Sequence, residues 1–295
     1  MFLLNTAQTG LPDQKESQDN AFEVSFLAKI VVETRASATL HKKSLFERRL
    51  DQFKQIMVSP EWESGDSAQK LTMDELCSAE EISNLKKLMQ EGLSPIELKI
   101  MVALERQQKG SMQILVVGCG IGRECFALDQ RGHKVTGIDY SDAVIAKANE
   151  MKSERVSKVQ FLQSELKDVP PVYDVMWITD RTVQLIPGNE KRIEFFKMVK
   201  DKALPTGRVV FSPKFMSFFG HPNYTWSSRL IKHRWRKLGI WSPGDVAEPR
   251  RIDSPHSNRL LFFHYYPKKQ DALLEIATAG LGVDTEIEHV WIIKP

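Results

Sequence analysis

Residues 114–141 read ILVVGCGIGRECFALDQRGHKVTGIDYS, and this stretch decides the fold. Its apolar start, 114–117, contains two valines and predicts a buried strand. A glycine-rich turn follows, and residues 124–130 then have the pattern of a helix. A second apolar run at 135–138 predicts the next strand. Strand, glycine-rich turn, helix and strand in this order predict an α/β fold with a doubly wound, mostly parallel sheet.

The turn contains Gly118, Gly120 and Gly122, and Asp139 follows the second strand. Glycines let a ligand approach the bare backbone, and the start of the next helix presents free N–H groups to it. Asp139 can accept hydrogen bonds from both hydroxyls of a ribose. A tight turn without a ligand is the alternative, but the order of the parts favours a nucleoside site. Because Arg123 follows the third glycine, the spacing differs from the dinucleotide pattern G-x-G-x-x-G.

In these features the chain resembles the class I S-adenosylmethionine-dependent methyltransferases, a Rossmann-like family, and in particular their small-molecule type. The resemblance covers roughly residues 94–212 and 260–295. It implies S-adenosylmethionine as the cofactor, with its methionine end at the glycine loop and its ribose at Asp139. The family usually has an acid two residues before the first glycine, where this chain has Val116. Some small-molecule members, the thiopurine methyltransferase-like group among them, also lack this acid, and the contact to the methionine amino group then comes from elsewhere or is lost.

The resemblance also assigns residues that follow the third and fourth strands, expected at 159–162 and 173–178. Glu165 is expected to reach the adenine amino group, with Asp168 as its rival, and Leu166 is expected to cover the ring. A solvated loop acid is the alternative for Glu165. The full set expected to bind the cofactor is Gly118, Cys119, Gly120, Gly122, Asp139, Tyr140, Glu165, Leu166 and Thr179.

The candidates for a catalytic base are Asp180, after the fourth strand, and His264. Methyl transfer is a direct displacement at an activated carbon, so the protein has mainly to align donor and acceptor. A base is needed only if the acceptor must first lose a proton. Structural roles compete with this one: Asp180 could cap a helix or pair with Arg181, and His264 lies in an aromatic run typical of packed side chains.

Residues 213–259 interrupt the alternation of strands and helices and are expected to form an insert after the fifth strand. Between residues 227 and 251 the insert has seven Arg or Lys against two acids. Its aromatic side chains could form an apolar acceptor pocket, its basic ones could bind a carboxylate or phosphate, or it could be a structural loop. The candidate acceptor-binding residues are Tyr224, Trp226, Trp241 and, beyond the insert, Tyr265.

The segment 229–239, RLIKHRWRKLG, is the one stretch that suggests nucleic acid. Its apolar residues fall on one helical face and leave the basic ones to solvent, so we expect a docked amphipathic helix and no nucleic-acid binding. We therefore expect transfer of a methyl group to a small-molecule acceptor at an O, N or S atom. The alternatives are an RNA or protein methyltransferase that docks through the basic insert, and a non-catalytic nucleoside-binding scaffold, which Val116 keeps open.

The sequence as a whole predicts three parts. They are a mobile arm at 1–20, a helical N-terminal extension at 21–93, and a methyltransferase domain at 94–295 that includes the insert. Within the extension, 60–69 is expected to be a linker, and a helix at 72–90 is expected to begin with a Thr72–Glu75 cap. The domain is expected to contain seven strands with an antiparallel last strand, and its fifth strand, at 208–211, is expected to follow a helix that ends at Pro205 and Gly207. A further strand edge is expected at 260–265.

The totals exclude several classes of protein. A net charge of +3, with 42% hydrophobic and 27% charged residues, is an ordinary globular mix. The three cysteines form no C-x-x-C pair, which argues against a zinc site or a disulfide framework and favours a reducing, cytoplasmic location. No long apolar run predicts a membrane segment. We expect no metal.

Overall fold

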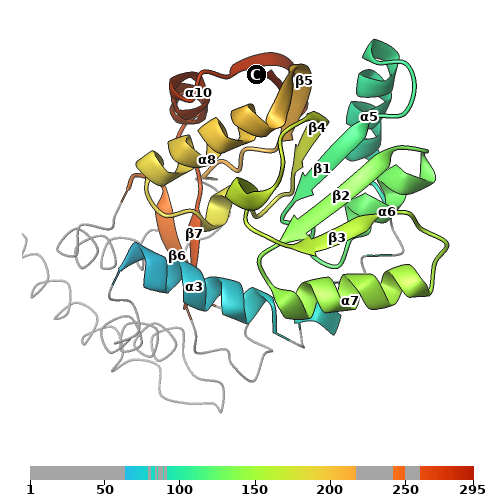
Figure 1. Ribbon diagram of the computed structural model, residues 1–295. Helices are drawn as coiled ribbons and strands as arrows, with labels where there is room; N and C mark the ends of the chain where they lie inside the picture. The colour runs from blue at the N-terminus through green and yellow to red at the C-terminus, as the bar shows by residue number, and fades with distance from the viewer. Residues whose placement is uncertain are drawn as a thin grey trace, which may run out of the picture. The chain divides into compact units, whose positions relative to one another are not determined.

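The computed structural model (Figure 1) describes residues 64–78, 81–83, 85, 89, 92–216, 242–249 and 260–295. All of them belong to one compact unit, residues 56–295. The predicted arm at 1–20, residues 21–63 of the predicted extension, and three acceptor candidates of the insert lie outside the described residues: Tyr224, Trp226 and Trp241. Among the described helices, none is long and apolar enough to cross a membrane.

A seven-stranded sheet with the order β3-β2-β1-β4-β5-β9-β8 forms the centre of the fold (Figure 1). The pairs among β1 to β5 are parallel, and β9 is antiparallel to both of its neighbours. The strands are β1 (Gln113–Val117), β2 (Lys134–Asp139), β3 (Gln160–Gln163), β4 (Tyr173–Ile178), β5 (Ala203–Phe211), β8 (Gly282–Ile287) and β9 (Val290–Lys294). The doubly wound, mostly parallel sheet with an antiparallel last strand is therefore confirmed.

Helices cover both faces of this sheet. On one face lie α5 (Pro95–Gln107), α6 (Arg123–Gln130) and α7 (Asp142–Ser153), and on the other lie α8 (Asn189–Lys202) and α10 (Lys269–Thr278). Alternate residues of β1 enter the two cores, Ile114 and Val116 on the first face, Leu115 and Val117 on the second. A strand that is buried on both faces must be apolar throughout, which explains the run that begins the decisive stretch.

Two helix starts follow directly from short sequence signals. The Ser94 hydroxyl accepts from the Glu97 N–H (3.3 Å), and the Glu97 carboxylate accepts from the Ser94 N–H (2.7 Å), a capping box that starts α5. The Ser141 hydroxyl accepts from the Val144 N–H and starts α7. These caps matter for function because α5 precedes β1, and α7 begins directly after the end of β2.

The expected linker at 60–69 is wrong from residue 65 onward, because helix α3 (Gly65–Leu76) begins there. Ser64 and Ser67 cap it reciprocally, and so the helix starts earlier than the Thr72–Glu75 signal predicts. Thr72 lies inside the helix, where its hydroxyl donates to the Ala68 carbonyl at 2.8 Å.

Around the insert, one expectation is corrected and one is confirmed. β5 begins at Ala203, and a register shift between β4 and β5 accommodates Pro205 and Gly207, which we expected to separate a helix from the strand. The expected strand edge at 260–265 is β7 (Leu260–His264), which pairs with β6 (Asp245–Pro249) of the insert in a separate two-stranded antiparallel sheet. Two short 3-10 helices, η1 (Leu166–Asp168) and η2 (Val183–Leu185), follow β3 and β4.

Candidate active site

The glycine loop joins β1 to α6 and is fixed to the end of β2 by backbone hydrogen bonds. The N–H groups of Gly118 and Cys119 both donate to the Ile138 carbonyl at 2.9 Å. The Gly122 N–H donates to the Cys119 carbonyl at 3.0 Å and closes the turn before α6. The loop is therefore held at the carboxyl edge of the sheet, where the strand order reverses between β1 and β4.

Asp139 ends β2 and lies against this loop. Its carboxylate accepts from the Gly120 N–H at 3.0 Å and from the Ser141 N–H at 3.2 Å. Burial raises the pKa of Asp139, although these backbone hydrogen bonds act in the opposite direction. A carboxylate accepts about four hydrogen bonds, so capacity remains for two ribose hydroxyls. The residue therefore fits a nucleoside, and its role as the ribose ligand stays a prediction.

The three glycines of the loop are required for different reasons. A Cβ at Gly118 would collide with the hydroxyl of Thr182, and one at Gly122 would lie 2.5 Å from the Phe161 ring. At Gly120 the backbone has a φ of +55°, and a Cβ would meet nothing within 4 Å. Gly118 and Gly122 thus allow close packing within the protein, whereas Gly120 borders open space in which a ligand could approach the backbone.

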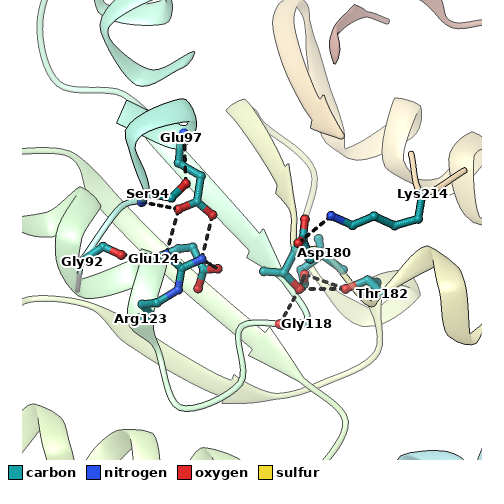
Figure 2. A network of polar contacts seen from close by, with 11 residues as sticks. Gly92, Ser94, Glu97, Gly118, Arg123, Glu124, Asp180, Thr182 and Lys214 are labelled. Atoms are coloured by element: carbon teal, nitrogen blue, oxygen red, sulfur yellow. Dashed lines mark hydrogen bonds and ion pairs between the residues drawn. The ribbon is translucent and has the colours of Figure 1, made fainter. Parts of the chain in front are cut away.

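Thr179 and Thr182 attach the end of β4 to the same loop, and Figure 2 shows Thr182 beside Gly118. The Thr179 hydroxyl donates to the Gly118 carbonyl at 2.7 Å, and the Thr182 hydroxyl donates to the Val117 carbonyl at 3.1 Å. The two hydroxyl oxygens lie 2.9 Å apart. The structure thus brings Thr179 to the glycine loop, as expected, and adds Thr182, which no sequence motif indicates.

Arg123 begins α6 and links the loop to α5 (Figure 2). Its guanidinium donates to both carboxylate oxygens of Glu97 at 2.8 and 2.7 Å, to Glu124 at 2.6 Å, and to the Gly92 carbonyl at 2.6 Å. Two carboxylates therefore compensate its charge. Arg123 thus joins the start of α6 to α5 and to Gly92, a role that the G-x-G-x-G-R pattern alone does not indicate.

Beyond β4, Asp180 forms an ion pair with Lys214, which follows β5 (Figure 2). The distance between Lys214 Nζ and Asp180 Oδ2 is 2.8 Å, and the side chains are 28% and 66% exposed. The Lys214 carbonyl accepts from the Tyr266 N–H at 2.8 Å, which fixes its backbone. The pair places opposite charges at the carboxyl edge beside the loop. Sequence analysis misses Lys214 because nothing in its local sequence distinguishes it from other surface lysines.

His264 lies in the interior at the end of β7. It is 2% exposed, and its Nδ1 lies 2.8 Å from Asp245 Oδ1. Burial lowers the pKa of His264, so the ring is neutral near pH 7. Its Nε2 has no hydrogen-bond partner among the described residues. The neighbouring Tyr265 is half-buried, and its N–H donates to the Gly244 carbonyl. His264 as a base and Tyr265 as an acceptor contact both stay predictions.

The remaining expected cofactor residues are distributed along the same edge. The Tyr140 hydroxyl lies 3.1 Å from the Cys77 sulfur, which follows α3. Glu165 is exposed and pairs with Lys167 at 2.7 Å, while Leu166 is buried in the core. Val116 is fully buried, so it supplies no polar contact where the resembling family usually has an acid.

Comparison with known proteins supports this interpretation of the fold. A family model described as a methyltransferase domain matches residues 108–212. The chain is 37% identical over 76 residues to a ubiquinone biosynthesis O-methyltransferase of Saccharophagus degradans, a match that covers 24% of this chain and 32% of the relative. The chain thus spans about a third of the length of this curated relative.

The chain is also similar to solved structures at low sequence identity. An S-adenosylmethionine-dependent methyltransferase from Methanosarcina mazei superposes with a TM-score of 0.50 at 16% identity, over 69% of this chain and 98% of that one. A magnesium protoporphyrin IX methyltransferase from Synechocystis, solved with S-adenosylmethionine bound, has a TM-score of 0.48 at 14% identity, over 77% and 95% of the two chains. Residues 108–212 thus match a methyltransferase domain, and the 3-2-1-4-5 order of parallel strands with an antiparallel β9 belongs to a fold that the chain shares with the Methanosarcina mazei methyltransferase.

Proposed function

We propose that this chain transfers a methyl group from S-adenosylmethionine to a small-molecule acceptor at the carboxyl edge of the sheet. The observation that carries the proposal is the pairing of Asp139 with the Gly120 N–H, beside open space at the point where the strand order reverses. In open α/β sheets this crevice is the general place for ligands. The match of residues 108–212 to a methyltransferase domain supports the same site.

Each part of the site has a distinct task in this proposal. S-adenosylmethionine supplies a methyl group that its sulfonium activates. Asp139 holds the ribose through its remaining acceptor capacity, and the Gly120 backbone leaves room for the ligand. The hydrogen bonds from Thr179 and Thr182 fix the distance between β4 and the loop, and therefore between acceptor and donor.

Asp180 and Lys214 are the groups we propose for the acceptor. Asp180 is the better candidate for a base than His264, because its carboxylate is exposed at the edge, whereas His264 is buried and paired with Asp245. An acceptor with an O–H group would donate its proton to Asp180, and Lys214 would stabilise the resulting negative oxygen. The O-methyltransferase named among the relatives supports an oxygen acceptor.

Calorimetric titration with S-adenosylhomocysteine tests the cofactor half of the proposal. We expect Asp139→Ala to lose about 1–3 kcal/mol of binding free energy, the scale for removing a charged hydrogen-bond partner. Asp142→Ala is the matched control, because this exposed acid begins α7 only three residues away. Equal affinity for the wild type and a folded Asp139→Ala protein would exclude the ribose role.

Transfer of a labelled methyl group tests catalysis and separates the alternatives. The acceptors to compare are a phenol, a catechol, an amine, a thiol, total RNA and a protein mixture. Label on a small molecule supports the proposal, and label on RNA or protein alone would favour docking of a macromolecule. Binding of S-adenosylhomocysteine without any transfer would favour a non-catalytic scaffold, an alternative that the buried Val116 motivates.

A further inference from the structure

Helix α3 lies far from the sheet in the sequence but contacts both sides of its carboxyl edge. In Figure 1 it runs beneath β6 and β7 toward α7. We call the part of this edge formed by Asp180, Lys214 and the two-stranded sheet of β6 and β7 the acceptor side. There, the buried Thr72 hydroxyl accepts from the Phe262 N–H of β7 at 2.7 Å. Leu76 packs on the apolar cluster of the two-stranded sheet, which contains Val246, Leu261 and Phe263. Asp66 forms an ion pair with Lys191 at the start of α8.

The other end of α3 reaches the nucleoside side. Cys77, which caps the helix, has its sulfur 3.1 Å from the Tyr140 hydroxyl. Tyr140 directly follows Asp139, the expected ribose ligand. Burial raises the pKa of both Cys77 and Tyr140, so the thiol and the phenol are neutral and share an ordinary hydrogen bond. One helix of 12 residues therefore joins a residue beside the expected ribose site to a strand of the acceptor side.

The two-stranded sheet of β6 and β7, which α3 contacts, depends on neighbouring elements for its stability. It consists of β6 and β7 alone, and an isolated two-stranded sheet is only marginally stable in water. The hydrogen bond from Phe262 to Thr72 fixes one edge of β7, while β6 pairs with the other. Any shift or loosening of α3 must therefore act on β7.

We propose that α3 couples the two halves of the site, so that cofactor binding beside Tyr140 orders β7, through Cys77 and Thr72, before the acceptor binds. The inference rests on the proposed cofactor site at Asp139. When the cofactor is bound, it restricts the motion of Tyr140, and the hydrogen bond between Tyr140 and Cys77 then restricts the end of α3. The hydrogen bond between Thr72 and Phe262 extends this restriction from α3 to β7. Cys77 and Thr72 are thus positioning residues, and because coupling is reciprocal, an ordered β7 also favours the cofactor.

Hydrogen–deuterium exchange of the full chain, with and without S-adenosylhomocysteine, tests the coupling. In the wild type we expect the ligand to slow exchange at 65–77 and at 261–264 by about fivefold or more, the lower end of typical couplings. In Cys77→Ala, protection of both segments should be lost, while ligand affinity stays within about tenfold of wild type because Asp139 and the loop are intact. In Thr72→Val, only the protection at 261–264 should be lost.

Conservative variants separate coupling from mere stability. Cys77→Ser places a hydroxyl where the thiol was, Thr72→Ser keeps the native hydroxyl, and both variants should restore the ligand-dependent protection. If the alanine or valine variant does not fold, alkylation of wild-type Cys77 gives an independent measurement, because Cys77 is partly exposed while Cys119 and Cys125 are buried. The ligand should slow alkylation of Cys77 by about fivefold or more.

The outcomes distinguish this inference from the proposed function. If the wild type does not bind S-adenosylhomocysteine in calorimetry, both fail. If it binds the ligand but exchange at 261–264 is unchanged, or if Cys77→Ala keeps that protection, the coupling is wrong and the proposed cofactor site stands.

Discussion

The cofactor side and the acceptor side of the carboxyl edge differ in what holds them together. On the cofactor side, the main contacts join residues close in the sequence, all within 114–141, as in the two backbone hydrogen bonds from the loop to Ile138 and the one from the Gly120 N–H to the Asp139 carboxylate. On the acceptor side, side chains join residues far apart in the sequence. A backbone-held loop tolerates changes in neighbouring side chains, whereas a side-chain network fails when one member is removed.

One such network joins α8 and α10 to β6, β7 and Tyr266. The buried Arg192 guanidinium donates to Glu275 at 3.0 and 2.7 Å, and the Tyr266 hydroxyl donates to the same carboxylate at 2.8 Å. Asp245 lies 3.8 Å from Arg192 and shares a hydrogen bond with His264. These groups attach the two-stranded sheet to the scaffold, and each depends on a partner because an unpaired buried charge is costly.

Arg192→Met should produce the largest change. It leaves the buried Glu275 without its cation, and we expect a loss of about 3–5 kcal/mol in the free energy of unfolding. Urea unfolding followed by circular dichroism measures this. Lys191→Met is the matched control on the adjacent residue, since its exposed ion pair with Asp66 is worth at most about 1 kcal/mol. The double variant Arg192→Met with Glu275→Leu should recover much of the loss, and no recovery would contradict the charge-based explanation.

Gly120→Val should have a smaller effect on folding but a large one on cofactor binding. The native φ of +55° is strained for valine, at a cost of about 1–2 kcal/mol to the free energy of unfolding. The side chain would also enter the open space beside the loop, so affinity for S-adenosylhomocysteine should fall by roughly a hundredfold or about 2.8 kcal/mol. Gly132→Ala is the control, because Gly132 also has a positive φ and open surroundings but follows α6 at the opposite edge. Unchanged affinity in a folded Gly120→Val protein would show that the loop is only a turn.

The sequence predicts the cofactor side better than the acceptor side, because the contacts of the cofactor side are local in the sequence. Strand and turn signals are local, so β1, β2 and the place of Asp139 follow from spacing. Partners separated by many residues leave no local signal: Thr72 and Phe262 are 190 residues apart, and Arg192 and Glu275 are 83 apart.

The sequence near a charged side chain also does not show which of two possible partners that side chain pairs with. Asp180 pairs with Lys214, whereas the local sequence offers the adjacent Arg181 as a partner. The helix start at Ser64 escapes sequence analysis because a serine–serine cap is a weaker pattern than Thr72 with Glu75 three residues later.

A smaller change in the free energy of unfolding is expected when pH is varied, because His264 on the acceptor side titrates. Burial lowers the folded pKa of His264 below the ordinary value of 6.5, with Arg192 acting in the same direction and Asp245 and Glu275 opposing it. Protons then bind the unfolded chain more tightly, so stability is present above pH 6.5 and is lost as pH falls toward the folded pKa. Each tenfold difference in proton affinity between the folded and unfolded chain contributes about 1.4 kcal/mol to this loss.

The measurement is the free energy of unfolding between pH 5 and 8, in which the slope near pH 6 should shrink in His264→Gln. His289→Gln is the control, since His289 is exposed. Equal slopes in the wild type and His264→Gln would assign the pH dependence to other groups.

The smallest effect on stability is expected from the pair that we place nearest to the acceptor. Asp180 is largely exposed, and an exposed ion pair contributes about 0–1 kcal/mol, so Asp180→Asn and Lys214→Met should unfold at nearly the wild-type urea concentration. Their effect on transfer should be large. If Asp180 takes the acceptor proton, Asp180→Asn lowers kcat for an O–H acceptor by about 10²–10⁴-fold with cofactor affinity unchanged. Lys214→Met should also lower kcat, because Lys214 would stabilise the oxygen that becomes negative during the reaction, and Lys214→Arg should recover it. Arg181→Met, which changes an exposed neighbouring charge, is the control. Equal losses from Arg181→Met and Lys214→Met would mean that general surface charge, and not the Asp180–Lys214 pair, serves the acceptor.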